Sequence, residues 1–145
     1  MQIFLAKTAG FCFGVDRAVS LVEQTIALGE KAVTLGPIIH NRHVVDRFNR
    51  LGVREIASPA EAAQEETVIL RAHGVPQAVQ AELAARGLRV VDATCPFVKK
   101  IHHIVQRAEA QGRRCIIIGS PEHPEVTAIA SLCTAPMIVP TAEAL

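Results

Sequence analysis

The chain has 145 residues, a length typical of one domain, and half of them are apolar, so it can bury a hydrophobic core. Its 15 basic and 14 acidic side chains leave a net charge of +1, and it has no Trp or Tyr to stack on bases, which argues against a nucleic-acid-binding protein. The apolar runs are too short for a signal peptide or a membrane span. We therefore expect a cytoplasmic protein that binds neither nucleic acid nor membrane.

Short apolar runs alternate with segments whose apolar residues recur at helical spacing. Glycines that follow several of the helical segments, such as Gly29 and Gly112, are typical helix ends. In chain order the pattern predicts a strand at 3–6, a helix at 15–28, a strand at 32–35, a helix at 41–51, strands at 53–56 and 67–70, a helix at 77–86, a strand at 88–93, a helix at 97–110, a strand at 114–118, a helix at 124–132 and a strand at 137–139.

This alternation predicts an α/β fold of βαβ units with small parallel sheets. The helix at 97–110 is expected to join two lobes. Residues 1–96 would form one complete α/β lobe, and residues 97–145 would form part of a second.

A residue that can bind metal or phosphate follows five of the predicted strands. The carboxyl ends of parallel strands lie on one edge of a sheet, where ligands bind, and the N–H groups at the start of the next helix favour anions. We therefore expect one shared site that contains Cys12, His40, His73, Cys95 and His123.

Structural disulfides are not expected in a cytoplasmic protein, so the four cysteines point to metal binding, catalysis or burial. The position of Cys12 and Cys95 at two strand ends favours a soft metal centre. An iron–sulfur cluster needs three or four thiolates, and zinc is an alternative, although no C-x-x-C spacing supports a zinc ribbon. Cys115 opens an apolar strand and is expected in the core, whereas the role of Cys133 is open.

His40, His73 and His123 share the strand-end context, and imidazolium groups beside helix N-termini suit a polyanion such as a diphosphate. Three other histidines lack that context, and we expect no site role for them: His43, His102 and His103.

Glu125 follows Pro124 and falls in the first turn of the last predicted helix. Its carboxylate could serve only to stabilise the helix dipole. Because it lies two residues from His123, we favour a proton donor over the bound ligand.

Five sequence motifs occur in order: "AGFCFGVDRAV", "GPIIHN", "RAHGVP", "DATCPFVKK" and "HPEV". Together they resemble the N-terminal portion of the LytB family, the 4-hydroxy-3-methylbut-2-enyl diphosphate reductases of the methylerythritol phosphate route to isoprenoids. The resemblance runs from Met1 to about Val126. It implies similar α/β lobes in a pseudo-threefold, three-lobed architecture around a central [4Fe–4S] cluster.

The resemblance also implies a role for each candidate residue. The two strand-end cysteines, Cys12 and Cys95, would be cluster ligands, the three histidines would hold the diphosphate of the substrate, and Glu125 would deliver a proton toward the leaving hydroxyl group. The reaction would be a reductive dehydroxylation that yields isopentenyl and dimethylallyl diphosphate. Ferredoxin or flavodoxin would be the electron donor.

The chain also departs from the family pattern. The third lobe and its cysteine ligand are missing, Ser120 stands where a second histidine often occurs, and Ala128 stands at a common glycine position. We therefore expect a truncated reductase that is inactive alone unless Cys133 or Cys115 replaces the missing ligand. Two alternatives remain: a non-redox phosphate- or diphosphate-binding module with vestigial cysteines, and a zinc-bound domain that uses Cys12, Cys95 and a nearby histidine.

Overall fold

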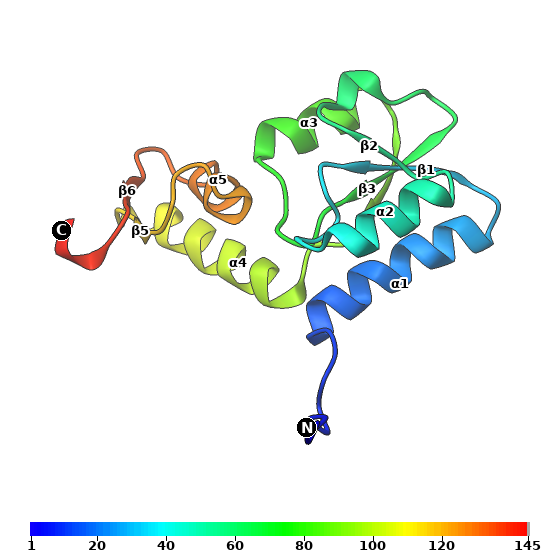
Figure 1. Ribbon diagram of the computed structural model, residues 1–145. Coiled ribbons are helices and arrows are strands. Elements are labelled where there is room, and N and C mark those ends of the chain that lie inside the picture. The colour runs from blue at the N-terminus through cyan, green and yellow to red at the C-terminus, as the bar shows by residue number, and fades with distance from the viewer. Residues whose placement is uncertain (145) are drawn as a thin grey trace.

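The structure, a computed structural model, describes residues 1–144. It contains two parallel sheets that are joined by one long helix (Figure 1). The first sheet has the strand order β2-β1-β3-β4, and the second pairs β5 with β6. Helix α4 (Pro96–Ala110) connects them. The strands are β1 (Lys31–Leu35), β2 (Arg54–Ile56), β3 (Glu66–Leu70), β4 (Arg89–Asp92), β5 (Ile116–Ile118) and β6 (Met137–Val139).

Helices cover both faces of the first sheet, so its central strands are buried on both sides. One face packs against α1 and α2 through residues such as Val22, Phe48 and Ile69. The opposite face packs against α3 through residues such as Val68 and Leu83. The helices are α1 (Phe13–Ala27), α2 (Arg42–Arg50), α3 (Gln77–Ala85) and α5 (Pro124–Ala130), with 3-10 turns at Pro59–Glu61 and Ala142–Ala144.

This architecture confirms the predicted α/β fold with parallel sheets. Apart from the strand at 3–6, each predicted strand and helix is present, with ends that differ by at most two residues. Gly29 and Gly112 follow α1 and α4 in the left-handed conformation that glycine adopts without strain, with φ of 74° and 68°. No helix in residues 1–144 is both long enough and apolar enough to cross a membrane.

The predicted strand at residues 3–6 is wrong. The structure has no regular element before α1, and Ile3, Phe4 and Leu5 are 80%, 87% and 87% exposed. A strand exists only where another strand accepts its hydrogen bonds, and within residues 1–144 this segment pairs with none. The β propensity of these residues is therefore not enough to make the segment a strand.

Candidate functional site

The loops that follow β1, β3 and β4 lie side by side beyond the carboxyl edge of the first sheet. The backbone N–H of Ala72 donates to the carbonyl of Ile38 (3.1 Å), and the N–H of Cys95 donates to the carbonyl of Ala72 (2.9 Å). These bonds extend the strand pairing past the ends of the strands. They fix the loops that carry His40, His73 and Cys95 relative to one another.

Three histidines from distant parts of the chain meet at this edge. The ring centroids of His40 and His73 are 4.3 Å apart, and His123 lies 5.6 Å from His40 and 5.7 Å from His73. A pocket of about 230 Å³ adjoins two of them, His40 and His73, and is also lined by Phe11, Val15, Ile39, Asn41 and Ala72. The sequence-predicted convergence of the three histidines is therefore present in the structure.

His123 is held in one orientation by the start of α5. Its Nδ1 accepts a hydrogen bond from the backbone N–H of Glu125 at 3.2 Å, so the side chain caps the helix. An Nδ1 that accepts leaves the proton of a neutral imidazole on Nε2. His123 therefore presents an N–H donor on the side of the ring away from the cap.

His73 is half-buried, and burial lowers its pKa to about 4, with further lowering by the charges of His40, His123 and Arg71. Its buried Nδ1 has no hydrogen-bond partner among the described residues. The side chain is therefore neutral at pH 7 in the free chain. An anion bound between the three rings would instead favour the protonated form of His73, because it offsets the repulsion among the imidazolium charges.

Cys12 and Cys95 occupy equivalent positions, each at the N-cap of a long helix, α1 and α4. The buried Gly14 lies so close to Cys95 that a Cβ added there would overlap its Sγ. The phenylalanines that follow the cysteines, Phe13 and Phe97, pack edge to face with centroids 6.5 Å apart. The two helix N-termini therefore meet, although only Cys95 follows a strand.

Two of the thiolates that an iron–sulfur cluster needs could come from this arrangement. Both thiols are free and at least partly accessible, and a helix N-terminus favours negative charge. Two thiols do not complete a cluster, which needs three or four. The cysteines present therefore fit such a cofactor as two of its three or four ligands.

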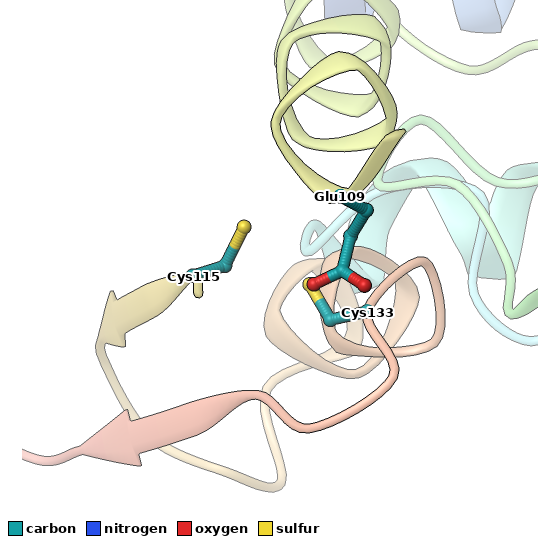
Figure 2. Close-up of side chains that lie close together, drawn as sticks. All are labelled: Glu109, Cys115 and Cys133. Carbon is teal, nitrogen blue, oxygen red and sulfur yellow. The ribbon is translucent and has the colours of Figure 1, made fainter. Parts of the chain in front are cut away.

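Cys115 and Cys133 do not supply the missing ligands. They face Glu109 at the far end of α4, and the 15 residues of this helix span about 22 Å at 1.5 Å per residue (Figures 1 and 2). Cys95 lies at its beginning. The expectation of a core position for Cys115 is wrong, because the residue is only partly buried. Burial raises the pKa of the Cys133 thiol to about 11, together with the neighbouring Cys115.

Glu125 lies in the first turn of α5, partly buried and two residues after His123 in the sequence. One residue near the histidines was not expected from the sequence: His102 of α4 lies against Gly74, where an added Cβ would be 2.9 Å from its Cε1. Burial lowers the pKa of His102, while the charges of Glu125 and Asp92 oppose this change. His102 differs from His103 in that it lies on the face of α4 that turns toward the first sheet. Nothing in the local sequence predicts which of the two histidines lies on that face.

Solved structures with this architecture exist. The chain superposes with a TM-score of 0.82 and 40% identity on a structure described as (E)-4-hydroxy-3-methyl-but-2-enyl diphosphate reductase, the terminal enzyme of the non-mevalonate pathway, covering 97% of this chain and 52% of that one. With the corresponding reductase from Plasmodium falciparum the TM-score is 0.89 at 28% identity, over 94% of this chain and 44% of that one.

Sequence comparison agrees. Proteins named 4-hydroxy-3-methylbut-2-enyl diphosphate reductase are 45% identical over 127 residues in Idiomarina loihiensis and 44% identical over 139 residues in Geobacter sulfurreducens. These segments are 87% and 96% of this chain but 40% and 49% of the relatives, so the chain spans about half of their length or less. The family model described as LytB protein matches residues 3–145. The chain therefore belongs to the LytB protein family.

Proposed function

We propose that this chain forms the cluster-binding and diphosphate-binding part of a 4-hydroxy-3-methylbut-2-enyl diphosphate reductase. Family membership and the reductase names of its relatives support the assignment. The observation that carries it is the convergence of His40, His73 and His123 beside the two helix N-termini that hold Cys12 and Cys95. A set of imidazole N–H donors next to a pair of thiols suits a diphosphate substrate that is to be reduced.

In this proposal the substrate is an allylic diphosphate, and the reaction replaces its C–OH bond by C–H. Two electrons and two protons enter, the hydroxyl group leaves as water, and the products are isopentenyl and dimethylallyl diphosphate. Ferredoxin or flavodoxin would donate the electrons in the cytoplasm. A bound [4Fe–4S] cluster would supply the electron-transfer chemistry, with Cys12 and Cys95 among its ligands.

The protein side chains would bind the substrate and move its protons. The Nε2–H of His123 is available to donate to a phosphate oxygen, because Nδ1 is engaged by the cap of α5. His40 is exposed and His73 is partly buried, so their ring N–H groups would meet the substrate at different depths below the protein surface. Glu125 would deliver a proton to the leaving hydroxyl group, which its position in the turn after His123 allows.

The lobe division belongs to the same proposal. Residues 1–96 would be the first lobe, which carries the first sheet, and residues 97–145 would be part of the second, which carries the β5–β6 pair. A third lobe, absent from these 145 residues, would complete the architecture and the cluster ligand set. Another polypeptide segment must supply that ligand, because Cys115 and Cys133 lie at the opposite end of α4.

Calorimetric titration with inorganic pyrophosphate and with isopentenyl diphosphate tests the anion site. We expect saturable binding that weakens about tenfold or more for each of His40→Ala, His73→Ala and His123→Ala, because each change removes a charge-assisted hydrogen bond. His43→Ala is the matched control, since His43 is exposed on α2 and outside the cluster. Equal losses in the control would remove the basis of the proposal.

The alternative is a non-redox diphosphate-binding module. It is supported by the presence of only two thiols at the site, which are too few to hold a cluster. Iron and acid-labile sulfide per chain separate the two functions when the chain is reconstituted anaerobically together with the C-terminal half of a LytB relative, which offers the missing ligand. The reductase proposal predicts iron binding that Cys12→Ser and Cys95→Ser abolish and Cys115→Ser leaves unchanged. Diphosphate binding without any iron would support the module instead.

A further inference from the structure

A second group of metal-binding side chains lies at the opposite end of α4 from the histidines. It consists of Glu109, Cys115 and Cys133, whose ligand atoms all lie within 4.8 Å of one another (Figure 2). Glu109 is in the last turn of α4, Cys115 directly precedes β5, and Cys133 follows the end of α5. Three elements that are separate in the sequence therefore meet at one point.

Backbone hydrogen bonds hold each of these residues in place. The carbonyl of Cys115 accepts from Met137 (3.1 Å), and the N–H of Cys133 donates to the carbonyl of Ala130 (3.0 Å). The carboxylate of Glu109 accepts from the backbone N–H of Thr134 at 2.9 Å, which ties the loop after α5 to the end of α4. The site is thus built largely before any ligand binds.

The three side chains have the composition of a thiophilic metal site. Both thiols are free, and all three residues are partly buried, so an ion can reach them from solvent. Two thiolates and one carboxylate are ligands that Zn²⁺ accepts, whereas Ca²⁺ and Mg²⁺ require oxygen ligands. Two cysteines are too few for an iron–sulfur cluster.

We propose that Glu109, Cys115 and Cys133 form a zinc site that is separate from the reductase site. The ion would replace the two thiol protons, and water would complete a tetrahedral coordination. At a Zn–S distance of about 2.3 Å the two sulfur atoms would lie about 3.8 Å apart. The present separation is at most 4.8 Å, so the sulfur atoms need to approach by no more than about 1 Å.

The site would stabilise the second sheet. Its ligands join the end of α4 to β5 and to the loop before β6, which form the small β5–β6 unit. A two-stranded sheet is marginal by itself, and a metal ion that links its elements adds its binding free energy to folding. The zinc site would therefore act as a structural clamp.

Cobalt titration of the 145-residue chain tests the proposal, with Cys12→Ser/Cys95→Ser as the host so that only the two relevant thiols remain. Under reducing, anaerobic conditions we expect one Co²⁺ per chain, with thiolate-to-cobalt charge-transfer absorption and tetrahedral d–d bands. One equivalent of Zn²⁺ should displace it. Cys115→Ser or Cys133→Ser in this host should weaken binding by about a hundredfold or more, since each removes one of three protein ligands.

Glu109→Gln separates metal binding from structure, because its amide oxygen can still accept from Thr134 while the negative charge is lost. We expect binding about tenfold weaker with unchanged unfolding of the metal-free chain, and no change for the exposed control Glu122→Gln. Absence of the charge-transfer bands, fewer than one ion per chain, or equal affinity in Glu109→Gln and its parent would overturn the three-ligand site.

Discussion

His73 shows how neighbouring charges set the state of a single side chain. It lies between two imidazoles and close to Arg71, so a proton on its ring is opposed by burial and by three cationic or potentially cationic groups. A pKa of about 4 keeps the ring neutral where free histidine, with a pKa of 6.5, is half protonated. The same surroundings that disfavour the cation would favour a bound anion.

The depressed pKa of His73 predicts a loss of stability at mildly acidic pH. The unfolded chain binds a proton near pH 6.5 and the folded chain only near pH 4, so the free energy of unfolding falls as the pH drops through this window and levels off below it. After allowance for solvent screening we expect a loss of about 1 kcal/mol at pH 5. Urea unfolding at pH 7 and pH 5 measures it.

A His73→Asn variant should lose this part of the pH dependence, because asparagine does not titrate. The His43→Asn control should retain it, since His43 is exposed on α2. If the free energy of unfolding falls equally in wild type and His73→Asn between pH 7 and pH 5, the pKa of His73 is not lowered in the folded chain.

Gly14 decides whether the two helix N-termini can meet. Because an added Cβ would overlap Cys95 Sγ and lie 3.0 Å from its Cβ, we expect Gly14→Ala to destabilise the chain by about 1–3 kcal/mol, despite the higher helix propensity of alanine. Displacement of Cys95 should also raise its rate of alkylation severalfold, as measured by mass spectrometry. Gln24→Ala, an exposed change on α1, should have neither effect.

Helix α4 sets the distance between the two groups of candidate metal-binding residues. Its first turn carries Cys95 beside the histidine edge, and its last turn carries Glu109 beside Cys115 and Cys133. A helix of 15 residues is a rigid spacer of about 22 Å. The four cysteines therefore lie in two separate groups and cannot combine in one cluster within this chain.

Helix α5 depends on His123 in two ways, as a cap and as a proposed ligand-binding residue. Asparagine is also a good N-cap, whereas alanine is not. We expect His123→Asn to keep the unfolding free energy within about 0.5 kcal/mol and His123→Ala to lower it by about 1 kcal/mol. Both should lose pyrophosphate binding, measured by calorimetry. Retained binding in His123→Asn would mean that the histidine acts only as a cap.

Most helices and strands could be predicted because their signals are local. β1 and β3 each follow one charged residue with four apolar or threonine residues, all buried, and glycines end the neighbouring helices. The strand-end position of His40, His73 and Cys95 also follows from the alternation of strands and helices. Convergence of these residues needed only the rule that parallel strands end on one edge.

The failures concern features that depend on distant partners. Residues 3–6 have strand composition, but no strand lies beside them in the described chain. The neighbours of His102 and the grouping of Glu109 with two cysteines arise from the way α4 packs against other segments. Such contacts between residues far apart in the sequence leave no periodic pattern that one sequence can reveal.

At the scale of the whole molecule, the described chain exposes apolar surface in several places. Ile116 and Ile118 on the outer face of β5 are each 55% exposed, and the sheet they belong to has two strands, so both of its strands are edges. Helix α4 exposes Phe97, Ile101 and Ile104, which recur at helical spacing along one side. Proteins that remain single in solution rarely leave such surfaces open.

We therefore expect the 145-residue chain to self-associate as its concentration rises, with the β5–β6 sheet as the main contact. Unpaired strand edges accept further strands, and apolar side chains on the same strand add to the free energy of association. Charged residues on an edge oppose pairing, so Ile116→Lys/Ile118→Lys should shift sedimentation velocity profiles toward the monomer. Leu28→Lys, at an apolar position at the end of α1 that is 76% exposed, should leave them unchanged. A chain that stays monomeric at high concentration, or equal effects of both variants, would show that the open sheet is not the surface through which the chain associates.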